Sequence, residues 1–267
     1  MVQQNDEVLF EQVGDVLIAR LNRTEQLNAL SAGISSGLHE LVRRLNSGET
    51  GARAAIITGE GRAFCAGGDV TGFPTSNQPH VRVRAAYARP HPERSIARAM
   101  HACDVPIIAA VNGFAVGAGF GLALAADLRI AADDAVFQVA QIKRGLVADY
   151  STGPLLQEAV GNQRALELML TGRRVNAEEA LALGLVLKVV PRDRLMDEAL
   201  ALANSIASGP PLGMAASKHV LYMAGDHNLE QADTFISLSV SSLFKTEDAA
   251  EGVKSFMERR EPEFKGR

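Results

Sequence analysis

The stretch Pro106–Ile130, PIIAAVNGFAVGAGFGLALAADLRI, decides the fold class of this 267-residue chain. Pro106–Val111 is a short apolar run that ends at a turn signal, the pattern of a buried strand. A glycine-rich turn follows, a helix begins within Gly117–Ala126, and Leu128–Ala131 indicates another strand. A strand, a crossover helix and a second strand are typical of a parallel sheet.

The same alternation continues on both sides of this stretch. Further strands are predicted at Asp15–Leu21, Ala54–Thr58, Val136–Val139 and Leu185–Val190. Asn28–Leu45 has apolar residues at helical spacing, and Ser31 near its start is a suitable N-cap. The sequence therefore predicts an α/β fold with mostly parallel strands.

Beyond about residue 153, helical patterns dominate. They lie at Pro154–Val160, Gln163–Leu170, Ala177–Leu183, Asp193–Ser208, Gly213–Met223, Leu229–Phe244 and Glu247–Arg259. Because these helices carry many apolar residues, they must pack on the core or on another subunit. We therefore divide the chain into an α/β core, residues 1–200, and a helical oligomerisation region, residues 201–267.

Composition and charge exclude several classes of protein. The chain is 47% hydrophobic and 22% charged, as in an ordinary globular protein. Its net charge of -4 gives no electrostatic basis for binding nucleic acid. Two cysteines, Cys65 and Cys103, cannot form a disulfide framework. The polar start, Met1–Glu7, and the absence of a long apolar run predict neither a signal peptide nor a membrane span, so we expect a cytoplasmic protein.

The common cofactor and nucleophile motifs are missing. The run Gly117–Gly121 is rich in glycine, but Leu122 stands where a dinucleotide fingerprint needs its third glycine. No phosphate-binding loop or nucleophile elbow is present. The six histidines have no metal-ligand spacing, so a metal site is not expected.

Two glycine-rich turns, each directly after a buried strand, are the strongest remaining signal. They are Ala63–Asp69 and Asn112–Gly119. Glycine lets a backbone N–H approach a ligand closely, so one N–H from each turn could meet on a single carbonyl oxygen as an oxyanion hole. The alternative is that the glycines serve tight turns and close helix–strand packing.

Four motifs resemble the crotonase (enoyl-CoA hydratase/isomerase) superfamily, in chain order. They are NRTEQLNAL at 22–30, AFCAGGD at 63–69, AVNGFAVGAGFGLALAAD at 110–127 and LTGR at 170–173. The segment Glu247–Lys265 resembles the closing helix of that family. Since the resemblance covers nearly the whole chain, the chain is identified as a member of this superfamily.

The resemblance implies a spiral of ββα units with a helical C-terminal trimerisation region. It also implies an acyl-CoA thioester as substrate, bound by the core at residues 1–200. Coenzyme A is then part of the substrate, and no separate cofactor is expected. We expect a homotrimer, or a hexamer made of two trimers, with neither nucleic acid nor membrane as a partner.

The resemblance assigns roles to residues of both turns. The family's two oxyanion donors map onto the backbone N–H groups of Gly68 and Ala118, which would stabilise a thioester enolate. One such donor is typically worth about 3–4 kcal/mol. The substrate and CoA side is expected to include Gln26, Leu27, Ala66, Gly68, Asp69, Val70, Ala118 and Gln141.

At two positions the chain departs from the family's hydratases, which use a pair of glutamates. The first glutamate aligns with Gly121 and the second with Gln141. Glycine has no side chain and an amide does not titrate, so neither residue can transfer the proton that hydration requires. We therefore expect a poor hydratase.

Asp149 is the remaining candidate acid/base. An aspartate at this place resembles the proton-shuttling base of family members that shift double bonds, and elsewhere in the superfamily it serves dehalogenation or thioester hydrolysis. A structural alternative is that Asp149 caps the helix that Pro154 leads. Apolar neighbours, including Phe120, Leu146 and Val147, predict a desolvated carboxylate, which would be the stronger base.

Because one carboxylate is enough to move a double bond, an enoyl-CoA isomerase with Asp149 as acid/base is the leading hypothesis. Three alternatives stay open: a hydratase or a hydrolase that uses Asp149, and a non-catalytic acyl-CoA-binding protein. The proline- and arginine-rich segment Thr71–Arg94 is either a solvated surface loop or a mobile substrate flap.

Overall fold

The computed structural model describes residues 6–69, 95–226 and 229–267 of the chain. Val70, an expected CoA contact, lies outside the described residues, and so does the segment Thr71–Arg94. The contact of Val70 with CoA therefore stays a prediction. Both interpretations of Thr71–Arg94, a surface loop or a substrate flap, stay open.

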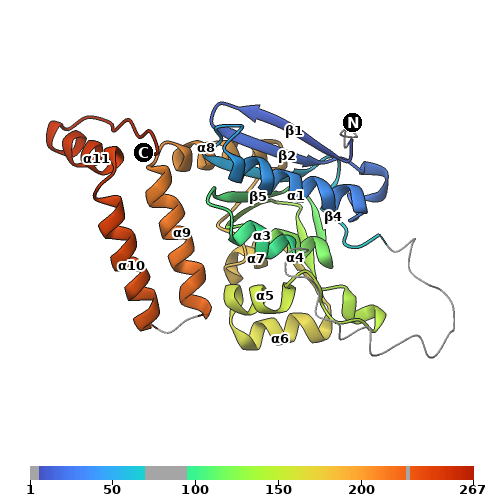
Figure 1. Ribbon diagram of the computed structural model, residues 1–267. Helices are drawn as coiled ribbons and strands as arrows, with labels where there is room; N and C mark the ends of the chain where they lie inside the picture. The colour runs from blue at the N-terminus through green and yellow to red at the C-terminus, as the bar shows by residue number, and fades with distance from the viewer. Residues whose placement is uncertain (1–5, 70–94, 227–228) are drawn as a thin grey trace.

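Two sheets form the centre of the described part (Figure 1). The larger, six-stranded sheet has the order β1 (Val8–Val13), β2 (Val16–Leu21), β3 (Ala54–Gly59), β5 (Ile107–Val111), β7 (Leu128–Ala132), β10 (Lys188–Val190). Here β1 pairs antiparallel with β2, and the other neighbours are parallel. The smaller, four-stranded sheet has the order β4 (Ala63–Cys65), β6 (Phe114–Val116), β8 (Val136–Gln138), β9 (Arg174–Asn176).

The predicted α/β class with mostly parallel strands is confirmed. Strands expected from the apolar runs appear as β2, β3, β5, β7 and β8, and the expected strand at 185–190 is shortened to β10. The pattern did not predict β1, β4, β6 and β9. The last three of these are only three residues long and lie within or beside turns.

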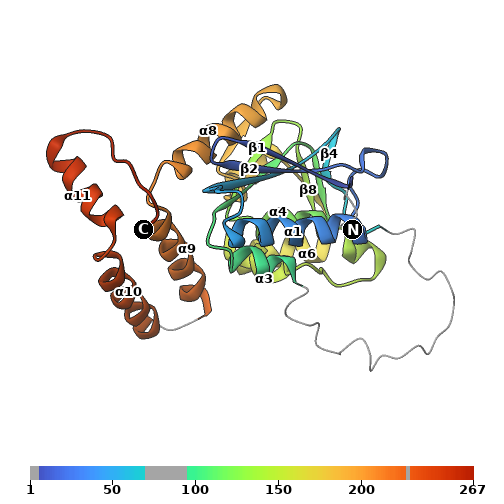
Figure 2. The ribbon, with the colours of Figure 1, turned by 45° about the horizontal axis from the view of Figure 1, so that its top comes forward.

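Helices cover both faces of the larger sheet (Figure 2). Successive strand residues point to opposite faces. Ala55 and Ile57 therefore join the core under α1 (Ala32–Ser47), α3 (Ile96–His101) and α4 (Ala118–Ala125). The alternate residues of β3 pack against α8 (Leu195–Ala207) on the other face. Residue 200, the predicted domain boundary, lies inside α8.

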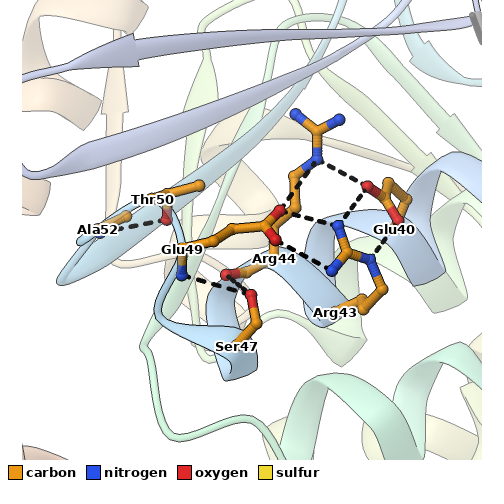
Figure 3. A network of polar contacts seen from close by, with 7 residues as sticks. All are labelled: Glu40, Arg43, Arg44, Ser47, Glu49, Thr50 and Ala52. Carbon is orange, nitrogen blue, oxygen red and sulfur yellow. Dashed lines mark hydrogen bonds and ion pairs between the residues drawn. The ribbon is translucent and has the colours of Figure 1, made fainter.

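Helix α1 begins and packs as its sequence predicts. The Ser31 side chain accepts a hydrogen bond from the Ile34 N–H, which is the expected N-cap. Its outer face carries a polar network in which Arg43 joins Glu40 and Glu49 (Figure 3). Hydrogen bonds from Arg43 and Arg44 lower the pKa of Glu40 to about 2.

The remaining helices extend the core and then leave it. Those after β8 are α5 (Thr152–Val160), α6 (Asn162–Thr171), α7 (Ala177–Leu183), α9 (Pro211–Asp226), α10 (Leu229–Leu243) and α11 (Glu247–Glu258). Both ribbon views show α10 and α11 standing away from the sheets. Several large apolar side chains there are exposed, among them Phe256 at 84%. Burying such residues is what the predicted oligomerisation requires.

A buried polar cluster attaches α9 to the core. Lys218 Nζ lies 2.8 Å from Asp127 Oδ2, and the Tyr222 hydroxyl donates to Asp127 Oδ1 at 2.7 Å. A cavity of about 720 Å³ adjoins this cluster, between α9 and the core helices. These polar groups satisfy one another, so the cluster has a structural explanation as the anchor of α9.

Candidate active site

The pairing of β4 with β6 brings the two glycine-rich turns together. These strands are parallel, with Ala63 opposite Phe114 and Cys65 opposite Ala115. The chain therefore leaves both strands at the same end of the smaller sheet. A Cβ on Gly119 would overlap the Cys65 carbonyl oxygen and lie 2.8 Å from the Cys65 Cβ. The two backbones are therefore in direct contact.

Gly67 makes a second close contact between the turns. A Cβ on this residue would lie 2.8 Å from the Val116 carbonyl oxygen and 3.6 Å from the Ala118 nitrogen. Its φ of 101° is also one that residues with a side chain rarely adopt. Packing and ligand approach are thus compatible roles for these glycines, because the same contacts place the first turn beside the Ala118 N–H.

The two expected oxyanion donors are the backbone N–H groups of Gly68 and Ala118. Leu30 donates to Gly67 and accepts from Asp69, so the N–H of Gly68 points away from this bridge. Ala118 is the first residue of α4, where a backbone N–H has no partner within the helix. Among the described residues, neither N–H donates a hydrogen bond. Two such donors on touching turns can hold a developing oxyanion.

The first expected CoA-binding segment lies along the Gly68 turn. The Ala66 N–H donates to the Leu27 carbonyl at 3.0 Å, directly after Gln26. Arg23 places Asp69 through an ion pair of 3.1 Å. Gln26, Leu27, Ala66 and Asp69 are therefore brought together beside Gly68, while their contact with CoA stays a prediction.

Asn28 supports this segment, and sequence reasoning gave it no role. Its side chain is fully buried and donates to the carbonyls of Glu60 and Ala63. It also accepts from the Arg23 N–H at 2.8 Å. Leu27 and Asn28 both have left-handed backbones, with φ of 51° and 56°. The hydrogen bonds of the buried Asn28 amide offset the free-energy cost of this backbone conformation. The sequence pattern alone does not reveal this role.

Gln141 and Asp149 meet beside the second turn. Gln141 opens a short 3-10 helix after β8, and its side chain lies 3.7 Å from the place a Cβ on Gly117 would occupy. The residue is only 8% exposed. Its Nε2 donates to Asp149 Oδ1 at 2.7 Å. The two polar residues singled out in the sequence are thus in contact, and Gln141 lies against Gly117, the residue before Ala118.

Two expectations about Asp149 are wrong. The expected apolar surroundings are not found, because Asp149 is exposed, Val147 is 81% exposed and Phe120 points into the core. The helix-cap alternative fails too: the Asp149 carboxylate binds Gln141, and it is the Asp149 carbonyl that accepts from Thr152. With no capping role, the carboxylate remains available for chemistry.

The packing around Gly121, where related hydratases are expected to have a glutamate, leaves no room for a side chain. A Cβ there would lie 2.5 Å from Thr152 Oγ1 and 2.9 Å from the Tyr150 carbonyl oxygen. Tyr150 and Ser151 are themselves two consecutive residues with left-handed backbones, with φ of 52° and 56°. This turn brings the chain against Gly121. The start of α5 therefore fills the space that a side chain at 121 would enter, and a glutamate does not fit without rearrangement.

Other chemistries find little support in the described residues. Burial raises the pKa of the Cys65 thiol to about 12, so it is not a thiolate at neutral pH. Within the described ranges, no three His, Cys, Asp or Glu side chains gather as metal ligands. Of the helices in these ranges, none has the length and apolar character needed to cross a membrane.

Known proteins resemble the chain along almost its whole length. Residues 11–267 match the family described as enoyl-CoA hydratase/isomerase. The (E)-benzylidenesuccinyl-CoA hydratase of Thauera aromatica is 37% identical over 266 residues, 97% of this chain and 99% of that protein. The carnitinyl-CoA dehydratase of Proteus mirabilis is 36% identical over 259 residues, 95% of this chain and 96% of that protein. The crystal structure of an enoyl-CoA hydratase from Bacillus anthracis has a TM-score of 0.88 at 31% identity, covering 98% of this chain and 100% of that chain.

The fold and the family match define the class as an enzyme acting on acyl-CoA with a crotonase fold. The chain belongs to the enoyl-CoA hydratase/isomerase family. The superfamily and the fold predicted from the four motifs, including the C-terminal helices, are confirmed. The roles of the individual site residues remain predictions.

Proposed function

We propose that this enzyme moves the double bond of a 3-enoyl-CoA to position 2, with Asp149 as its single acid/base. The observation that carries the proposal is the contact of the exposed Asp149 carboxylate with Gln141, whose side chain lies over Gly117, the residue before Ala118. Neither position that aligns with a hydratase glutamate offers a titratable group. The Asp149 carboxylate, which is exposed and contacts Gln141, is therefore the proposed proton carrier.

In the proposed mechanism, the backbone holds the charge and Asp149 moves the proton. The N–H groups of Gly68 and Ala118 bind the thioester oxygen. Asp149 takes a proton from C2, and the electron pair of the broken C–H bond delocalises onto that oxygen as an enolate. The same carboxyl returns its proton to C4 while the double bond forms between C2 and C3. No water enters, and the atoms of substrate and product are the same.

Hydration of a 2-enoyl-CoA is the second candidate. It is favoured by the activities for which two relatives are named, a hydratase at 37% identity and a dehydratase at 36% identity. For this reaction Asp149 alone would have to handle both the water and the proton. The isomerase remains the better fit because it needs a single proton carrier.

The test is the parallel turnover of 3-enoyl-CoA and 2-enoyl-CoA by wild type and Asp149→Asn, with products identified by mass and chromatography. Isomerisation without change of mass, lost in the variant, is the expected result. A gain of 18 mass units that survives in the variant would replace the proposal with hydration by other groups. Binding of both esters without turnover would favour an acyl-CoA-binding protein.

Two accompanying predictions follow from family membership and carry over to this chain as proposals. One is assembly into a homotrimer or hexamer through the C-terminal helices, which the exposed apolar side chains of α10 and α11 support. The other is a cytoplasmic location. Light scattering in solution tests the first, and fractionation of the source cells tests the second.

A further inference from the structure

We propose that Gln141 is the positioning residue for Asp149: its amide holds Oδ1 and so leaves Oδ2 to exchange the proton with the acyl chain. This inference rests on the proposed function, since it assumes that Asp149 is the base. It concerns a residue of this chain that stands where related hydratases have a glutamate, and it gives the amide a role of its own.

The first argument is that a single donor orients the carboxylate. Within the described ranges, Gln141 Nε2 at 2.7 Å is the side-chain donor to the Asp149 carboxylate. Asp149 is otherwise exposed, so nothing else in these ranges fixes its rotation. A carboxylate with one oxygen held presents the other in a defined direction, which is what proton transfer to a bound substrate requires.

The second argument is that Gln141 itself is rigid. Its backbone carbonyl accepts a hydrogen bond from the Leu146 N–H at 3.1 Å, which closes the short 3-10 helix. Its side chain packs over Gly117, and the amide lies at an ordinary contact distance of 3.7 Å from the place of a Cβ there. A donor on a fixed support can position an exposed carboxylate, whereas a mobile donor cannot.

The third argument comes from the far end of the amide. Gln141 Oε1 is buried and has no hydrogen-bond partner in the described part of the chain. An ionised carboxylate only accepts, so Asp149 forces the Nε2 side of the amide toward itself and Oε1 away from it. Apolar packing alone would favour a leucine or methionine here, because an unpartnered carbonyl is unfavourable. The donor function explains why an amide is kept.

An amide also suits this place better than a second acid. Two adjacent carboxyl groups would share protons and titrate as a pair. The amide donates at every pH and leaves Asp149 as the single titrating group of the pair. Three other titratable groups of the described residues lie nearby. Burial raises the pKa of the Tyr150 phenol, and the charge of Asp149 adds to this; Lys143 and Arg144 of the 3-10 helix are exposed. Substitution of Gln141 leaves these three unchanged.

The test compares the pH profiles of Gln141→Met, Gln141→Glu and wild type. In Gln141→Met, kcat should fall about 10- to 100-fold with KM changed less than about threefold, because orientation rather than binding is lost. The acid limb of the profile should also move up, because the ionised carboxylate loses its hydrogen-bond donor. In Gln141→Glu, activity should recover as the pH falls into the range in which the two carboxyls share one proton, since the protonated acid then donates as the amide did.

Gln138→Met is the matched control. Gln138 lies on β8, is also 8% exposed, and donates from Nε2 to the Gly172 carbonyl at 2.7 Å, with no bond to Asp149. This variant should lower stability and leave the acid limb in place. An equal loss of kcat in both methionine variants without a shift of the limb would reduce Gln141 to a structural residue and overturn the proposal.

A readout without turnover separates this proposal from the proposed function. The titration of the Asp149 carboxyl is followed by carbon NMR of aspartate-labelled protein, with Asp149→Asn to assign the signal. A higher midpoint in Gln141→Met supports positioning even if 3-enoyl-CoA proves not to be the substrate. An unchanged midpoint contradicts it, whatever reaction the enzyme catalyses.

Discussion

Gly68 and Ala118 bring backbone N–H groups to the candidate site, whereas Gln141 and Asp149 bring side chains. The backbone half is held by contacts between main chains that only glycines at 67 and 119 permit. The side-chain half is held by one hydrogen bond, with the carboxylate exposed. The difference indicates that the first half cannot change without disturbing the fold, while the second can change its chemistry on the same frame.

The largest effect is expected from Gly119→Ala, which attacks the backbone half. Alanine is the better helix former, but its Cβ would overlap the Cys65 carbonyl, so the turns must separate. We expect a loss of about 1–3 kcal/mol of stability and a fall of about 10²–10³ in turnover, because the two donors no longer converge. Thermal unfolding and kcat/KM measure both effects.

A helical glycine in open surroundings is the control for this prediction. In Gly213→Ala, on α9, the nearest atom would be a Pro210 carbon at an ordinary 3.4 Å. This variant should be as stable as wild type or slightly more so. If Gly119→Ala behaved like Gly213→Ala, the tight contact between the turns would not be what holds the donors in place.

Asp149→Asn attacks the side-chain half and should leave the fold intact. Asparagine can still accept the Gln141 hydrogen bond, so the geometry is kept while the proton carrier is removed. Turnover of 3-enoyl-CoA should fall about 10²–10⁴-fold, with unchanged unfolding temperature and unchanged affinity for the ester. Asp197→Asn, an exposed acid on α8, is the matched control and should be fully active.

The two halves also differ in how far the sequence could predict them. The turns and their glycines were predicted because apolar runs and glycine positions are local signals, and the structure brings the two turns into contact. The role of Gly68 and Ala118 as oxyanion donors stays a prediction. The strands β4 and β6 that join the turns were missed, since three residues show no period and their pairing is non-local.

The side-chain half could be named from the sequence but not assembled. Its contact between Gln141 and Asp149 depends on rotamers and on the left-handed pair Tyr150 and Ser151. Non-glycine residues rarely adopt that conformation, so propensity argued against the turn that places Asp149 at the surface. The prediction of apolar surroundings for Asp149 was wrong for the same reason. The identity of the neighbouring residues in the chain does not determine in which direction their side chains point.

Gly121 lies where the halves meet, and Gly121→Ala should show a smaller effect. Its Cβ would meet Thr152 Oγ1 at 2.5 Å and the Tyr150 carbonyl at 2.9 Å, which predicts a loss of about 1–2 kcal/mol in chemical denaturation. Gly121→Glu should be at least as destabilised and should gain no hydratase activity toward 2-enoyl-CoA. Rapid hydration by that variant would show that Gln141 does not stand at the second glutamate position.

The smallest effect is expected far from both halves, at Glu40 on the outer face of α1. Its pKa is lowered from the ordinary 4.5 to about 2 by hydrogen bonds from Arg43 and Arg44, so the carboxylate adds stability above pH 4.5 and loses it as the pH falls toward 2. Solvent screening limits this contribution to about 0.5–1 kcal/mol. Glu40→Gln should therefore unfold slightly earlier than wild type at pH 7 and together with it near pH 2, with unchanged turnover. Salt at about 0.5 M should shrink the difference, because it screens exposed charges; a difference that persists in salt would assign the effect to packing.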